Sequence, residues 1–435
     1  MRYILHYTKP GDVVFDAFAG TGMAGVAAQL CGDSQEVQGL GYRVTSDGSI
    51  LDETGKPISK IGTRRAVLND LAPAATFIAQ NYNAKRDETA YRTTSEQVFV
   101  QLQNRLEWMF TTLHEPSKAE LEEVTASLRK NDKSCLSKSS QFGRINYVIW
   151  SDVFLCGECS KEVIFWDSAV DQDNGKVRDE FACPHCNELL RKRELERAFT
   201  VSNDHALGTL VKQAKAVPVR IRYTFAGQRY EKKADAADLA LIEMIAREPV
   251  PFWFPSGRMP EGVETRRNDS AGITHFHHFY TPRNLRSFAT AYALLPSTHR
   301  WIVTGALQRG SKQHQIAITR IGGEKAGDGG ATAGHRRGTL YIPSNQVEMN
   351  ALELLRDRAR SIASAVQSYE ITAGSIVTTQ SAGSINIPDN SVDYFFFDPP
   401  FGANIAYSEL NSIFEAWLKV YTNNKSEAIE DRGQK

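Results

Sequence analysis

The sequence carries two short motifs, each directly after an apolar run, whose side chains could do chemistry. Residues 16–22 (DAFAGTG) follow the apolar run Val13–Phe15 and precede a small-residue helix expected at residues 23–30. Residues 398–401 (DPPF) follow the apolar run at residues 392–397. In open α/β sheets, ligands bind beyond the carboxyl ends of the strands. Both motifs are therefore placed for a ligand site.

The glycine motif predicts a loop whose backbone approaches a nucleotide-like ligand closely. It is not the dinucleotide fingerprint, because the third glycine is displaced to Gly25 and Asp16 would repel a pyrophosphate. A cationic ligand fits better, and S-adenosylmethionine carries a sulfonium and an ammonium group. Asp70 follows a second expected strand and can accept hydrogen bonds from ribose hydroxyls. The alternative is a tight packing corner without a ligand. The predicted cofactor-binding residues are Asp16, Phe18, Gly20, Gly22 and Asp70.

The proline motif predicts a site for a planar amine. Its prolines fix the backbone and withhold N–H donors, so a carboxylate, carbonyl oxygens and an aromatic ring are presented together. Hydrogen bonds to Asp398 and to the Pro399 carbonyl would free the delocalised lone pair of an adenine or cytosine amino group, while Phe401 stacks on the flipped base. The alternative is a strand stopped by prolines. The predicted catalytic residues are Asp398, Pro399, Pro400 and Phe401.

Four cysteines form two C-x-x-C pairs, which predict a four-cysteine zinc ribbon with a structural ion and no open coordination position. The run at residues 161–166 between the pairs has strand character, and His185 is expected to point away from the ion. The histidines of the segment 275–278 are expected to pack at a helix entrance before Thr281 and Pro282, and no metal is assigned there. The predicted zinc ligands are Cys156, Cys159, Cys183 and Cys186.

These motifs together resemble the amino-methyltransferases of DNA, specifically the adenine-specific DNA methylase family that contains a zinc ribbon. The resemblance covers about half of the chain, in these segments: 10–32, 67–79, the cysteine module, 275–289 (HFHHFYTPRNLRSFA), 338–344 (GTLYIPS) and 391–418. It implies S-adenosylmethionine with Asp16, Gly20 and Gly22 at its methionine end and Asp70 at its ribose. Residues 398–401 would then face the target base. The sequence has Phe401 where tyrosine is more usual, a change that preserves stacking.

The resemblance implies an α/β fold, a Rossmann-like methyltransferase sheet interrupted by helical and zinc-ribbon insertions. The apolar run at residues 392–397 is typical of a central parallel strand covered by helices on both faces. Helices are expected from Thr94, which forms a capping box with Gln97, and at residues 117–129, 350–366 and 408–421. Five regions are expected: 1–90, the cofactor-binding half; 91–146, a helical insert; 147–200, the zinc ribbon; 201–345, a basic insert for target recognition; and 346–435, the catalytic half.

Charge and hydropathy limit the partners. The 51 basic residues balance the 51 acidic ones, so a polyanion-binding surface must be local. Residues 187–233 hold eleven Lys or Arg against five Asp or Glu, and residues 300–337 hold seven against two. No apolar stretch is long enough to cross a membrane and no secretory signal is present, so a cytoplasmic location without a membrane partner is expected.

The expected function is methyl transfer to an exocyclic amine of DNA, with adenine N6 favoured over cytosine N4. Two alternatives stay open: a methyltransferase for an amine of RNA or protein, and a catalytically incomplete zinc-ribbon subunit that binds nucleic acid. The family's sheet has seven strands, and only 34 residues follow Phe401. The resemblance therefore implies weak or no activity alone and a second polypeptide that completes the domain. A restriction or defence partner is also open.

Overall fold

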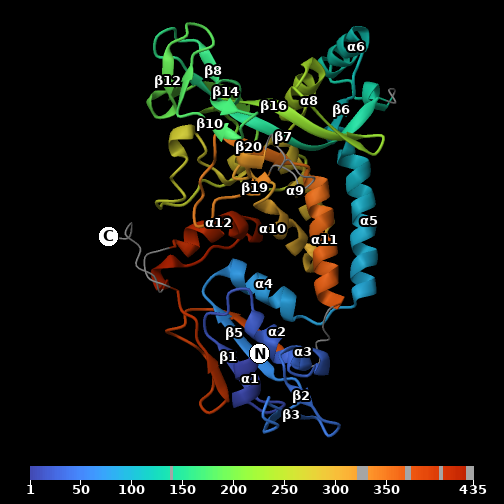
Figure 1. Ribbon diagram of the computed structural model, residues 1–435, viewed down its shortest axis with the longest axis vertical. Coiled ribbons are helices and arrows are strands. Elements are labelled where there is room, and N and C mark those ends of the chain that lie inside the picture. The colour runs from blue at the N-terminus through green and yellow to red at the C-terminus, as the bar shows by residue number, and fades with distance from the viewer. Residues whose placement is uncertain (138–140, 321–331, 368–373, 401–404, 428–435) are drawn as a thin grey trace. The chain divides into compact units, whose positions relative to one another are not determined.

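The computed structural model describes residues 1–137, 141–320, 332–367, 374–400 and 405–427. The chain divides into two compact units. Unit 1 comprises residues 1–96, 297–301 and 359–435, and unit 2 comprises residues 97–296 and 302–358. Segments from both ends of the chain therefore build unit 1, where the blue N-terminal strands meet the orange and red C-terminal segment (Figure 1).

Unit 1 contains a parallel four-stranded sheet in the order β21-β5-β1-β22. The chain forms β1 and then adds β5 and β21 on one side before β22 pairs with the other side of β1. The strand bounds are Val13–Asp16 (β1), Arg65–Asp70 (β5), Ser375–Thr379 (β21) and Tyr394–Phe396 (β22). Successive strands are thus added first on one side of β1 and then on the other, so the strand order reverses between β1 and β22.

Two helices pack on this sheet. Helices α2 (Met23–Leu30) and α4 (Pro73–Asn83) contact β5 and each other, and Ala28 and Ala79 are fully buried between them and the strands. Helix α12 (Tyr407–Leu418) packs on α4, where the buried Glu415 accepts the Ala74 N–H. The remaining elements before α4 are α1 (Arg2–Tyr7), α3 (Ser34–Gly39) and the antiparallel strands β2 (Arg43–Val44), β3 (Ser49–Leu51) and β4 (Pro57–Lys60).

Unit 2 is built around the 14-residue strand β7 (Phe142–Leu155), which belongs to a nine-stranded sheet. The strands of its main path are β17 (Gln228–Lys232), β16 (Ala216–Phe225), β7, β20 (Asn345–Met349), β18 (Gln315–Ile316) and β19 (Thr332–Gly334). Strands β6 (Thr111–Leu113), β8 (Glu162–Ile164) and β13 (Glu196–Arg197) also pair with β7. Helices of this unit include α6 (Lys118–Arg129), α8 (Ala236–Arg247) and α9 (Pro282–Leu294). Helices α5 (Glu88–Leu106), α10 (Trp301–Leu307) and α11 (Ala351–Gln367) each continue from one unit into the other.

The mixed α/β class and most expected elements are confirmed, while the start of one helix and the place of one strand are corrected. Helix α5 begins at Glu88, so Thr94 lies inside it and the capping box expected there is wrong. The side chain of Asp87 instead accepts the Ala90 N–H at the start of this helix. Strand β22 is not a covered central strand, because it lies at the edge of the sheet formed by the described residues, and Phe395 and Phe397 are each 56% exposed. No helix in the described ranges has the length and apolarity needed to cross a membrane.

Candidate functional site

Three carboxylates meet at the carboxyl ends of neighbouring strands in unit 1. Asp16 is the last residue of β1, and it lies opposite Leu68 of β5 and Phe396 of β22. Asp70 and Asp398 each follow those partners by two residues. The strand register therefore places one aspartate on each side of Asp16, and the sheet brings together residues that are far apart in the sequence.

This arrangement perturbs the acidity of Asp16. Asp16 is only 4% exposed, and its pKa is raised to about 6. Burial is the largest cause and the negative charges of Asp70 and Asp398 add to it, while a 3.1 Å hydrogen bond from the Phe18 N–H acts in the opposite direction. Ionising Asp16 is costly here because two like charges are close and little water is available. A cation bound among the three carboxylates would relieve that cost.

The glycines of the loop have different roles. Gly20 has φ +51°, a Cβ atom built there would meet no atom within 4 Å, and its N–H donates to Asp70 Oδ2 at 2.8 Å. Gly22 has φ +79°, and a Cβ atom would lie 2.7 Å from the Cβ of Ala79 in α4. Gly22 is thus explained by helix packing, as the packing-corner alternative holds, whereas the open space beside Gly20 leaves room for a ligand.

Asp70 is held in place while keeping acceptor capacity. The Ala72 N–H donates to its Oδ1 at 2.9 Å and the Gly20 N–H to its Oδ2. A carboxylate offers about four lone-pair positions, so two remain for further donors such as ribose hydroxyls.

Asn69 is a positioning residue that the sequence did not reveal. It is fully buried, and its Nδ2 donates to the carbonyls of Ala17 and Gln380 at 3.2 and 3.1 Å. Its Oδ1 accepts the Thr378 hydroxyl at 2.9 Å. One side chain therefore connects the loop after β1 with the ends of β5 and β21. The only signal in the sequence is a polar residue directly after the apolar run at residues 66–68.

The predicted catalytic motif is described in part. Asp398 and Pro399 are exposed just beyond β22, and Pro400 is partly buried. The Phe397 ring lies 6.0 Å from the Phe18 ring of the glycine loop, at 66°. Phe401 lies outside the described residues. The site thus gathers Asp16, Phe18, Gly20, Asp70 and Asp398 at one edge of the sheet.

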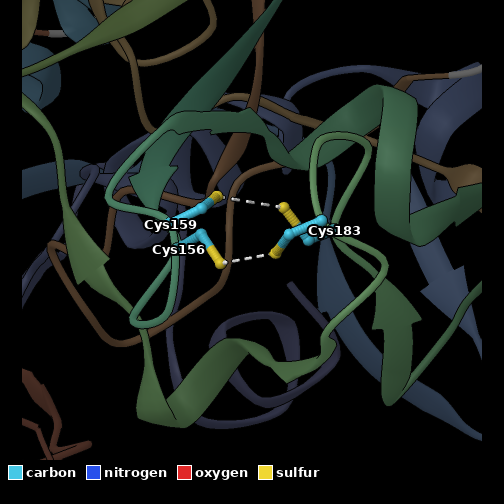
Figure 2. A group of neighbouring side chains, drawn as sticks. Cys156, Cys159 and Cys183 are labelled. Atoms are coloured by element: carbon cyan, nitrogen blue, oxygen red, sulfur yellow. Dashed lines mark hydrogen bonds between the residues drawn. The ribbon is translucent and has the colours of Figure 1, made fainter.

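The four predicted metal ligands come together in unit 2. The Sγ atoms of Cys156 and Cys186 are 3.7 Å apart, those of Cys159 and Cys183 are 3.8 Å apart, and all four lie within 4.8 Å of one another. These distances exclude disulfides, whose sulfur atoms are about 2.05 Å apart. Four thiolates around zinc at about 2.3 Å would be about 3.8 Å apart in a tetrahedron. Figure 2 shows the two cysteine pairs facing each other from separate loops, a cluster that could hold a metal ion.

The surroundings support a closed structural site. Cys156 and Cys183 are buried with Phe154, Phe165 and Phe181 in a small apolar cluster beneath the loops. His185 is directed away from the sulfur atoms, since its Nε2 lies 3.0 Å from the Glu162 carbonyl oxygen. Strand β8 is followed directly by helix α7 (Phe165–Ala169), so the expected strand at residues 161–166 is only half correct.

A second group of metal-binding residue types lies in the same unit. Asp204 Oδ2 accepts from His277 Nε2 at 2.8 Å and His278 Nε2 at 2.9 Å, and all three side chains are buried. Their ligand atoms are close enough to hold an ion. The Thr274 N–H donates to His278 Nδ1 at 3.3 Å, which places the remaining ring proton on Nε2, toward Asp204. That proton occupies the position a metal would need, so hydrogen bonds explain this Asp204 cluster.

The histidine segment also forms the helix entrance expected from the sequence. Residues Phe276–Phe279 make a buried 3-10 turn, and the Thr281 hydroxyl then accepts the Asn284 N–H at the start of α9.

Comparison of the chain with family models, with curated proteins and with solved structures found no match.

Proposed function

We propose that the chain is an S-adenosylmethionine-dependent DNA methyltransferase acting on an exocyclic amine, with adenine N6 favoured by the family resemblance. The observation that carries this proposal is the placement of Asp16, Asp70 and Asp398 at three neighbouring strand ends around an open glycine loop. This group of carboxylates is chemically suited to a sulfonium and an ammonium group, and unsuited to a phosphate.

The strand order also favours this proposal. In order of appearance in the chain the strands are arranged 3-2-1-4, as are the first four strands of a Rossmann-type sheet. Ligands of such sheets bind at the switch point, here between β1 and β22. The cofactor site and the DPPF motif lie on the two sides of that point.

Each part of the site would have a distinct task. Asp16 would face the cationic end of the cofactor, and Asp70 would accept from its ribose. When bound, S-adenosylmethionine supplies an electrophilic methyl group. Asp398 and the Pro399 carbonyl would accept hydrogen bonds from the target amine, which localises the nitrogen lone pair for attack. Phe18 and Phe397 would limit water at the reacting atoms.

Unit 2 offers features suited to a polyanion. A groove beside the cysteine loops is lined by five cationic side chains and two acidic ones, of which Glu180 pairs with Arg191. The cationic residues are Arg178, Arg191, Lys192, Arg193 and Arg197. We assign structural zinc to the four cysteines, because a tetrahedral thiolate site would stabilise these loops where the apolar core is small. An RNA or protein amine as substrate, or a subunit without catalysis, are the alternatives to be tested.

One experiment separates these possibilities. The purified chain is incubated with S-adenosylmethionine labelled in its methyl group and with duplex DNA, RNA or a protein mixture, and the labelled product is identified by nucleoside or amino-acid analysis. We expect cofactor binding and only a small amount of labelled N6-methyladenine from DNA, because the resemblance implies weak activity without a second polypeptide. Label only in RNA or protein would support the second candidate, and absence of cofactor binding by calorimetry would overturn the proposal.

The proposal also predicts a division of roles between two aspartates. Asp398→Ala should lower methyl transfer by at least about 100-fold while leaving cofactor affinity within about twofold, because Asp398 would act on the base. Asp70→Ala should instead weaken cofactor binding by about 10- to 100-fold through lost hydrogen bonds to the ribose. Asp389→Ala, at an exposed aspartate before β22, is the matched control. Equal loss of cofactor binding in both site variants would contradict the assigned roles.

A further inference from the structure

Strands β14 (Phe199–Asp204) and β15 (Thr209–Ala214) of unit 2 form a two-stranded sheet of their own. Such a hairpin is marginally stable unless other parts of the protein hold it. Its exposure is unusual, because Val201 is 64% exposed and Leu210 is 72% exposed. The hairpin therefore exposes apolar side chains to solvent, although a two-stranded sheet on its own should be only marginally stable.

Contacts at its tip and along β15 hold the hairpin in place. At its tip, Asp204 is bound by the buried imidazoles of His277 and His278 in the Asp204 cluster. Along β15, the backbone lies against Gly272, where a Cβ atom would come within 2.1 Å of the Lys212 carbonyl oxygen. The tip and one strand are thus fixed to the rest of unit 2.

In the described part of the chain, one face of the hairpin is exposed and open to a partner. Strand register places Val201 opposite Lys212 and Asn203 opposite Leu210, so these four side chains share one face with Phe199. The Lys212 ammonium lies 4.6 Å from the Phe199 ring centroid, as expected for diagonal neighbours on one face. This outward face mixes apolar side chains with an amide and a cation.

The charge of the region favours nucleic acid as that partner. The hairpin lies within residues 187–233, which hold the excess of six positive charges in a chain whose net charge is zero. The major groove of DNA is about 12 Å wide and admits a two-stranded β-ribbon. Within it, lysine recognises guanine, asparagine recognises adenine and apolar side chains contact the thymine methyl group. The outward face carries each of these residue types.

We propose that the hairpin β14–β15 reads duplex DNA from the major groove through its outward face. Lys212 and Asn203 would contact base edges, and Val201 and Leu210 would contact thymine methyl groups. The Asp204 cluster would act as a positioning group that keeps the ribbon rigid. This inference rests on the proposed function, because it identifies the element that selects the DNA sequence.

The first test selects bound duplexes from a library with a randomised segment, using the full chain. We expect the unsubstituted chain to enrich a preferred sequence. Val201→Ser and Lys212→Gln should each reduce the preference for that duplex over a scrambled one by about 5- to 150-fold. Val100→Ser in α5 and Lys130→Gln at the end of α6, both at exposed positions, are matched controls and should change it less than twofold.

The second test probes a single methyl group. Each thymine of the preferred duplex is replaced in turn by uracil, which removes only the methyl group in the major groove. At one or more positions the unsubstituted chain should lose about 3- to 10-fold in affinity, and Val201→Ser or Leu210→Ser should show no further loss there. Unchanged zinc content and melting temperature in each variant show that the fold is intact.

Three outcomes overturn the inference. They are equal sequence preference in the hairpin variants and the unsubstituted chain, a lack of any uracil effect, and a failure of the chain to select DNA. Methyl transfer distinguishes failure of this inference from failure of the proposed function. Sequence-selective binding through the hairpin without cofactor binding or transfer would contradict the enzyme alone, and transfer to DNA without any effect of the hairpin variants would contradict the ribbon alone.

Discussion

At the scale of single residues, the environment of Asp16 departs strongly from water. Burial and two neighbouring carboxylates raise its pKa from the ordinary value of 3.8 to about 6. Such perturbed groups are typical of sites that bind or react. The same perturbation opposes folding, because the ionised form is better solvated in the unfolded chain.

We therefore predict opposite effects of Asp16→Asn on stability and cofactor binding. The folded chain binds the Asp16 proton more tightly than the unfolded chain, so the free energy of unfolding decreases as pH rises from about 4 to 6 and stays lower above. The asparagine cannot ionise, and it should raise the free energy of unfolding at pH 7 by about 1 to 3 kcal/mol. Denaturant titration at pH 4 and pH 7 measures this, and equal effects at both pH values would contradict it.

Cofactor affinity should change with pH in the direction opposite to the free energy of unfolding. A cationic ligand requires ionised Asp16, so affinity should rise by up to about tenfold per pH unit below pH 6 and level off above. Asp16→Asn should bind weakly without this dependence. Calorimetry between pH 5 and 8 provides the measurement.

The carboxylates were predictable because each one follows an apolar run, and a strand end is readable from one local segment. Asn69 was not, because its partners Ala17 and Gln380 lie 52 and 311 residues away in the chain. Its role depends on which carbonyls the sheet brings within reach. A local sequence pattern contains no information about which distant carbonyls the fold brings close to Asn69.

At the scale of elements, the glycine loop depends on how closely α2 approaches α4. Gly22 precedes α2 in the left-handed region and touches Ala79, and the Asn83 side chain donates to the Gly22 carbonyl at 3.0 Å. Gly20 has a left-handed conformation without such crowding. The two positions therefore separate packing from ligand access.

We predict that Gly22→Ala lowers the free energy of unfolding by about 2 to 4 kcal/mol, because backbone strain adds to a clash with α4. Gly20→Ala should cost only about 1 to 2 kcal/mol. It should nevertheless weaken cofactor binding more than Gly22→Ala does at a temperature where both are folded. Thermal unfolding and calorimetry test the pair, and a larger stability loss for Gly20→Ala would contradict the packing argument.

The ends of the elements were less predictable than their presence. Thr94 and Gln97 match a capping box, but Asp87 supplies the cap about two turns earlier and the helix passes through Thr94. The cysteine spacing predicted a small ribbon, whereas β7 is a long strand that serves both the ribbon and the nine-stranded sheet. The local spacing of the cysteines identifies the two cysteine loops, whereas the pairing of distant strands with β7 sets the size of the ribbon.

At the scale of the whole molecule, the cysteine cluster and the carboxylate site belong to different units. We predict one zinc ion per chain by elemental analysis of reduced protein. Cys183→Ser or a strong chelator should increase hydrogen exchange at residues 154–191 and weaken DNA binding, because the loops lose their common ligand. Cofactor affinity should change less than twofold. The absence of zinc, or an equal loss of cofactor binding, would contradict this separation.

The pairing of β1 with β22 determines when the site can exist. Val13 N–H bonds to Asp393 across 380 residues of sequence, at 2.8 Å. At about 5 to 20 residues per second, the ribosome needs roughly 20 to 80 s to make the chain between them. Meanwhile β1 has one open edge, and unit 2 emerges before unit 1 is closed. The three carboxylates can meet only after residue 398 has been synthesised, so a nascent chain has no complete site.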